Sequence, residues 1–169
     1  LSTTKEHIKT YRPHFLVLTG EPRARPDLIA FTSQLAKQSV SLIVCGNVLR
    51  GGFSENRDQW FESRDDTYLE QEGIKAALDV VTAPDLRTGA AQLTQNGGIG
   101  KLRLNTTVIG YKEDWQTLDK EELSQHVGLI RDAFDMRMSA LVTRNLSTLK
   151  LKPTGDGHRD DPKLRMHGR

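Results

Sequence analysis

Short apolar runs alternate with segments of helical periodicity along most of this chain. The runs have the length of strands and the near-continuous hydrophobicity of strands that are covered on both faces. They span residues 14–19, 39–44, 74–81, 106–109 and 139–143. Strand–helix alternation of this kind forces parallel pairing through right-handed crossovers. The pattern therefore predicts an α/β fold, a five-stranded doubly wound parallel sheet in the order 3-2-1-4-5 with helices on both faces.

Four helices are predicted between the strands, and each begins where the residues favour a helix start. These starts are Pro26, Ser54, the Thr82–Asp85 segment and Asp119. Residues spaced three or four apart predict the buried faces. The faces are Leu28, Phe31 and Leu35 in the first helix; Trp60, Phe61 and Leu69 in the second, which runs to about residue 72; Leu86, Ala90 and Leu93 in the third; and Leu123, Val127, Ile130 and Phe134 in the last.

Length and charge predict one folded domain with polar ends. The 169 residues suit a single domain, and no apolar run approaches the ~20 residues that a membrane-spanning helix needs. Residues 150–169 hold six Lys or Arg and three Asp, so the basicity lies in that segment and the rest is nearly neutral. We expect a linker at 1–12, an α/β domain at 13–145 and a flexible basic tail at 146–169, with no nucleic-acid partner. The first residues lack an initiator Met, which predicts a piece of a longer polypeptide.

The reactive residue types show no catalytic or metal-binding pattern. Cys45 is the only cysteine, and it lies in an apolar strand, which predicts a buried thiol in a reducing, cytosolic setting. The five histidines lack metal-ligand spacing, and neither Ser54 nor Ser139 has the context of a hydrolase nucleophile. We therefore predict a non-enzymatic domain without a metal.

Three predicted strands end in glycine, at Gly20, Gly46 and Gly110. The carboxyl ends of parallel strands line one edge of the sheet, where ligands bind at the topological switch point. These glycines are candidate ligand-binding positions, although glycine also ends strands where nothing binds.

Basic residues follow two of these strands and strengthen the case for a nucleotide site. Arg23 and Arg25 come after the first strand, and Lys112 comes after the fourth. No phosphate-binding glycine motif stands at a strand-to-helix turn. The glycine cluster at 97–100 follows a helix and precedes a strand, so we predict a helix end and a tight connection there. Gly20, Arg23, Gly46, Gly110 and Lys112 are thus candidate nucleotide-binding residues, with ATP as the candidate ligand.

Two adjacent aromatic residues, Trp60 and Phe61, cannot both face the core. One of them is a candidate for a partner surface, either a second copy of the chain or a loop of a membrane domain. Ser147, Thr148 and Thr154 in the predicted tail are candidate phosphorylation sites.

The chain resembles the cytosolic C-terminal domain of cation-chloride cotransporters over about residues 9–145. Segments that carry the resemblance follow one another in order and at matching spacing. They are Tyr11-Arg12-Pro13, residues 15–20, 25–28, 42–49, 83–89, 97–102 and 105–111, Trp115, and Asp132-Ala133-Phe134-Asp135. The segments around Trp115 and Phe134 are closer to the sodium-coupled branch than to the potassium-chloride branch.

The resemblance implies a regulatory domain related in fold to universal stress proteins. It implies a homodimer that modulates electroneutral K⁺, Na⁺ and Cl⁻ transport by a membrane bundle, with regulatory kinases as further partners. The chain corresponds to the first half of that domain, at the cytoplasmic face of the plasma membrane within a multi-pass protein. Relatives of the fold bind ATP with glycines after the fourth strand, whereas residues 111–115 here read Tyr-Lys-Glu-Asp-Trp.

Two other functions fit the same pattern. The chain could be a stand-alone nucleotide-binding α/β protein similar to the universal stress proteins. It could also be a general interaction module that uses its exposed acidic helix.

Overall fold

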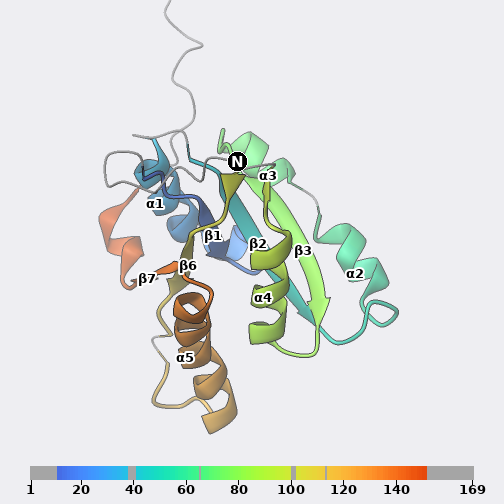
Figure 1. Cartoon of the computed structure of the whole chain (residues 1–169). Helices are drawn as coiled ribbons and strands as arrows, with labels where there is room; N and C mark the ends of the chain where they lie inside the picture. The colour runs from blue at the N-terminus through green and yellow to red at the C-terminus, as the bar shows by residue number, and fades with distance from the viewer. Residues whose placement is uncertain (1–10, 38–40, 65, 100–101, 113, 152–169) are drawn as a thin grey trace, which may run out of the picture.

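A parallel five-stranded sheet organises the described part of the chain, which comprises residues 11–37, 41–64, 66–99, 102–112 and 114–151 of a computed structural model (Figure 1). The strand order is β3-β2-β1-β6-β7, and β4 and β5 form a separate antiparallel pair. With the five parallel strands numbered alone, this order is 3-2-1-4-5, so the predicted fold class and topology are confirmed. The strands are β1 (Phe15–Leu18), β2 (Ile43–Arg50), β3 (Ala77–Ala83), β4 (Gly98–Ile99), β5 (Leu102–Arg103), β6 (Thr106–Gly110) and β7 (Ser139–Thr143).

Helices cover both faces of this sheet, as the alternation predicted. The three long helices are α1 (Pro26–Ala36), α4 (Leu86–Asn96) and α5 (Lys120–Asp135). The short ones are η1 (Pro22–Ala24), α2 (Arg57–Glu62), α3 (Thr67–Gln71) and η2 (Leu146–Leu149). Asp85 and Asp119 accept backbone hydrogen bonds from Thr88 and Glu122 at 2.8 and 2.7 Å, so both predicted helix starts are capped.

The sheet divides the core into two apolar clusters, because successive residues of a strand point to opposite faces. On β1, Phe15 and Val17 belong to the cluster that includes Leu28 and Ile29 of α1. Leu16 and Leu18 belong to the cluster that includes Leu93 of α4 and Leu129 of α5. All four residues of β1 are buried, as expected for a central strand.

The predicted strands at residues 39–44 and 74–81 both end too early, because β2 runs to Arg50 and β3 runs to Ala83. Gly46 does not end its strand, because β2 continues to Arg50 and pairs with β3 as far as Ala83. A Cβ at Gly46 would lie 2.7 Å from Leu93 Cδ1 and 3.1 Å from Leu16 Cδ1. The glycine therefore makes room for the core within a strand. Residues 38–40, where the predicted strand began, lie outside the described part.

The predicted helix from Ser54 to about Glu72 is two short helices, α2 and α3. Trp60 and Leu69 are nine residues apart, so a continuous helix with about 100° per residue would place them on opposite faces. The break between α2 and α3 lets both side chains face the protein. The Trp60 indole donates to the Val80 carbonyl of β3 at 2.9 Å, and Leu69 is fully buried in the α1-side cluster.

The predicted inner face of α5 is only partly correct, because Ile130 packs against the core whereas Val127 and Phe134 do not. Val127 and Phe134 are 55% and 62% exposed, whereas Leu129 and Ala133 are buried. A Cβ at Gly128 would lie 2.5 Å from Arg87 Nε of α4, so the glycine permits a close approach of the two helices. Arg87 forms a bidentate ion pair with Asp132, with Nε–Oδ2 and Nη2–Oδ1 distances of 2.7 and 2.5 Å.

The predicted inner face of α1 is wrong at one position. Leu35 is exposed although its spacing predicted burial.

The glycine cluster forms the predicted helix end and tight connection. The Gly97 amide donates to the Leu93 carbonyl at 2.7 Å at the end of α4. Gly98 has a φ of +125° and opens the β4–β5 hairpin, and Gly100 lies outside the described residues.

The ends of the chain fall mostly outside the described residues. This applies to the predicted linker up to residue 10 and to the tail from residue 152, including Thr154. Ser147 and Thr148 are exposed in η2. Within the described ranges, no helix combines the length and apolarity needed to cross a membrane.

Candidate functional site

The crevice beyond the carboxyl end of β1, between β2 and β6, is the candidate functional site. Central strand β1 ends at Leu18, which pairs with Gly46 on one side and Ile109 on the other. The chain leaves the sheet between these neighbours, which is the switch point where α/β folds bind ligands. A cavity of about 190 Å³ lies there, and its wall includes Thr19, Gly20, Gly46, Arg25, Lys112 and His126.

Gly20 and Gly46 line this cavity, whereas Gly110 lines an adjacent one. Gly20 has a φ of +64°, which favours glycine, and its amide donates to the Gly46 carbonyl at 3.2 Å. Gly110 is the last residue of β6, and a Cβ there would lie 3.1 Å from Arg25 Nη1. Gly110 thus leaves space for the Arg25 side chain above the end of the strand.

The structure brings Arg25 and Lys112 together at the crevice and places Arg23 elsewhere. Arg25 and Lys112 both line the 190 Å³ cavity and an adjacent one of about 570 Å³, which also includes Gly110, Tyr111 and Arg144. The Arg23 guanidinium lies 5.3 Å from the centre of the Tyr68 ring, in a neighbouring groove. Arg25 is therefore a better candidate than Arg23 for binding an anion at the crevice.

His126 of α5 is a site residue that the sequence reasoning missed. It lines the crevice, its Nε2 atom is enclosed, and that atom has no hydrogen-bond partner among the described residues. Burial lowers the pKa of His126, and the positive charges of Lys112 and Arg25 lower this pKa further. The sequence contained no direct signal for His126, because the buried face of its helix was predicted to contain the neighbouring Val127, which is in fact exposed.

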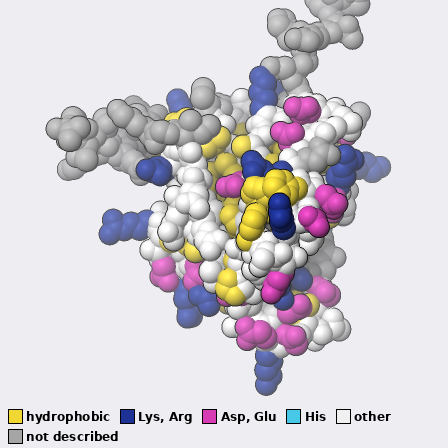
Figure 2. Space-filling view, turned by 90° about the vertical axis from the view of Figure 1, so that its right-hand side faces the viewer, with side chains coloured by type: hydrophobic (Ala, Val, Ile, Leu, Met, Phe, Trp, Pro, Cys, Tyr) yellow, Lys and Arg dark blue, Asp and Glu magenta, His cyan; other side chains and the backbone are white. Residues whose placement is uncertain are grey.

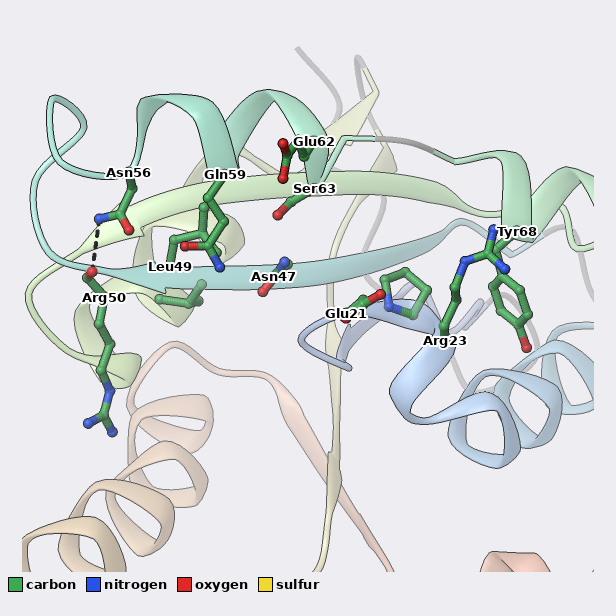
Figure 3. A pocket seen from close by; sticks show the side chains of 12 residues that line it. Glu21, Arg23, Asn47, Leu49, Arg50, Asn56, Gln59, Glu62, Ser63 and Tyr68 are labelled. Atoms are coloured by element: carbon green, nitrogen blue, oxygen red, sulfur yellow. Dashed lines mark hydrogen bonds between the residues drawn. The ribbon is translucent and has the colours of Figure 1, made fainter.

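The neighbouring groove, of about 670 Å³, lies over the part of β2 that extends beyond β1 (Figure 3). Gln59 and Glu62 of α2 and the following Ser63 line one side, and Glu21 and Arg23 line the other. Asn47 of β2 lies between them and is only 7% exposed, yet its side chain forms no hydrogen bond with any described residue. Val48 of β2 lines both this groove and the crevice.

Trp60 and Phe61 face different surroundings, as their adjacency required. Trp60 packs edge to face with Phe53 and Phe61, with ring centres 5.5 and 5.1 Å apart, and the Arg64 guanidinium lies 4.5 Å from its ring centre. Phe53 and Phe61 remain 50% and 59% exposed. Figure 2, which faces the α2 side of the molecule, shows hydrophobic side chains gathered among Lys, Arg, Asp and Glu. We call Phe53, Trp60 and Phe61 the aromatic surface.

Cys45 lies in β2 and is fully buried, as predicted. Burial raises the pKa of its thiol to about 12, so the nucleophilic thiolate is not formed near neutral pH. His14 has a structural contact, because its Nδ1 accepts a hydrogen bond from the Leu42 amide at 3.0 Å. Within the described ranges, no three His, Cys, Asp or Glu side chains are grouped as metal ligands would be.

Comparisons with known proteins match most of this chain to one sequence family. The family model described as Solute carrier family 12 matches residues 25–166. The chain is 37% identical to "Solute carrier family 12 member 3" of Mus musculus over 85% of its length. It is 40% identical to "Solute carrier family 12 member 2" of Danio rerio over 82% of its length, and 34% identical to member 3 of Homo sapiens over 94%. The chain spans only 12–16% of the length of these three relatives.

Proposed function

This chain belongs to solute carrier family 12, the cation-chloride cotransporter family, and we propose that it is a cytosolic regulatory and assembly domain of such a transporter. In this role the domain is non-catalytic and modulates K⁺, Na⁺ and Cl⁻ movement through a separate membrane part. We place it at the cytoplasmic face of the plasma membrane, next to the second half of the same cytosolic domain. Regulatory kinases are further proposed partners.

The aromatic surface is the observation that carries this proposal. Ring contacts with Trp60 hold Phe53 and Phe61 in place, yet half or more of each is exposed. Trp60 also ties the surface to the outer strand β3 through the Val80 carbonyl. Ordered, exposed aromatic side chains are typical of the centres of protein interfaces. Burying one such ring stabilises a complex by about 1.5–3 kcal/mol.

We predict that the 169-residue chain forms homodimers through this surface and that Phe61→Ser shifts it towards monomers. The change removes apolar area that only the dimer buries. Light-scattering mass over a range of protein concentrations measures the shift. Phe134→Ser is the matched control, since Phe134 is equally exposed on α5 and lies outside the aromatic surface. A chain that stays monomeric, or that dissociates only with Phe134→Ser, would contradict this interface.

Nucleotide binding in the crevice is a second candidate function, with ATP as the proposed ligand. The observation that favours it is the pair of cations, Arg25 and Lys112, which line both the switch-point cavity and an adjacent cavity of about 570 Å³. The described part of the Tyr111–Trp115 segment contains no glycine to form a phosphate cradle, so side chains would provide the phosphate contacts.

Saturating ATP is expected to raise the thermal midpoint of the chain. Ligand at 100 times its Kd stabilises a protein by about 2.7 kcal/mol, which shifts the midpoint by roughly 5–10 °C for a domain of this size. Lys112→Gln should remove most of the shift, because it removes a phosphate-facing charge. Lys120→Gln, a change at an exposed position outside the four cavity walls, should leave the shift intact. Equal shifts in both variants would exclude this site.

A further inference from the structure

Three nitrogen-bearing side chains from distant parts of the sequence meet at the switch-point crevice. Arg25 comes from the segment before α1, Lys112 from the segment after β6 and His126 from α5. Arg25 and Lys112 are permanent cations at neutral pH, whereas histidine titrates close to it. The three side chains line one small cavity of about 190 Å³, so the charge of an anion held there acts on all of them.

The surroundings of His126 favour the neutral imidazole in the protein without an anion. Burial and the charges of Lys112 and Arg25 all disfavour the imidazolium form. Helix α4 contributes the apolar Leu86 to the cavity wall, and its Arg87 is paired with Asp132. The carboxylate of Glu122 lies one turn earlier on α5 itself. The enclosed Nε2 atom of His126 also lacks a hydrogen-bond partner among the described residues, so the neutral ring is incompletely satisfied.

We propose that a phosphate-bearing anion bound between Arg25 and Lys112 draws a proton from solvent onto His126, so that binding at this crevice is coupled to proton uptake. The proposal rests on the nucleotide-binding candidate and adds a third anion-binding side chain to it. The phosphates would neutralise the two cations that oppose the imidazolium and would supply the nearby negative charge that stabilises it.

The sign of the pH dependence follows from this linkage. The pKa of His126 is below its ordinary value in the free protein and is raised in the complex. Within the interval between the two pKa values, the complex holds more protons than the free chain. Affinity therefore falls as pH rises through that interval, by at most about tenfold per pH unit for one proton.

Calorimetric titration of the 169-residue chain with ATP, in buffers of different ionisation enthalpy at one pH, measures the protons taken up. His126→Gln keeps a polar side chain that cannot titrate. Phosphate groups titrate near pH 6 themselves, so the proton uptake of the variant is subtracted as the background. We expect a positive difference of up to one proton, and about tenfold weaker binding of ATP by the variant at the acid end of the interval. Tripolyphosphate should give the same difference, because the proposed coupling involves the phosphates and not the base.

Ring nitrogen chemical shifts of His126 provide a readout that a structural role would not change. They should report a neutral imidazole in the free chain and an imidazolium at saturation with ATP. Equal proton uptake by the wild type and His126→Gln, or a ring that stays neutral at saturation, would overturn the coupling and leave nucleotide binding intact. Binding of neither ATP nor tripolyphosphate would overturn both.

Discussion

Leu129→Ala is expected to lower the free energy of unfolding by about 2–5 kcal/mol, the range for large-to-small changes in a packed core. Leu129 is 4% exposed and packs in the α4–α5 side of the core with Leu16 and Leu93. Its truncation removes apolar contacts and leaves a cavity that the neighbouring strands cannot fill. Urea unfolding followed by circular dichroism measures the loss.

Val127→Ala is the matched control on the same helix, two residues earlier. Its side chain is more than half exposed, so the change should stay within about 0.5 kcal/mol. The pair distinguishes the two apolar stripes of α5, one of which sequence periodicity assigned to the core. A larger loss at Val127 than at Leu129 would mean that the helix packs through the face predicted from the sequence.

Gly46→Ala is expected to destabilise the protein by about 1–3 kcal/mol through overpacking. The added methyl group would lie too close to Leu93 of α4 and to Leu16 of β1, whose side chains both face Gly46. Relief requires both leucines to move in a core that is already filled. The free energy of unfolding again measures the effect.

Gly52→Ala tests whether this cost is steric. The nearest atom to a Cβ at Gly52 is Ser54 Oγ at 3.9 Å, so an alanine there should be tolerated. Gly46→Ala should also weaken ATP binding if the nucleotide candidate is correct, because Gly46 lines the crevice. Equal stability of the two variants would contradict the role of Gly46 as a space-making residue within β2.

Much of the crevice could be located from the sequence, since glycine and basic residues directly followed predicted strands. Parallel pairing then brought Gly20, Gly110 and Lys112 to one edge of the sheet, and Gly46 of β2 lies beside the end of β1. The choice between Arg23 and Arg25 could not be made in this way, because it depends on the path of η1. His126 was missed because its helix was assigned the wrong inner face.

The resemblance to cation-chloride cotransporters, drawn from ordered segments of the chain, is confirmed by the family match. The assembly role, the aromatic surface as an interface and the binding of ATP remain proposals.

The amino-acid sequence by itself determined which five segments form the parallel sheet and in which order they pair. Near-continuous apolar runs are buried when helices cover both faces of the sheet. Because a helix connects each pair of successive strands, the strands pair in parallel, and their crossover connections are right-handed. Only the tertiary structure showed which side of α5 faces the core and that Gly46 lies within β2. It also showed that the predicted acidic helix at residues 54–72 is two helices, α2 and α3. These outcomes depend on the shape of the neighbouring surface, and a periodic pattern does not specify the side chain against which each residue packs.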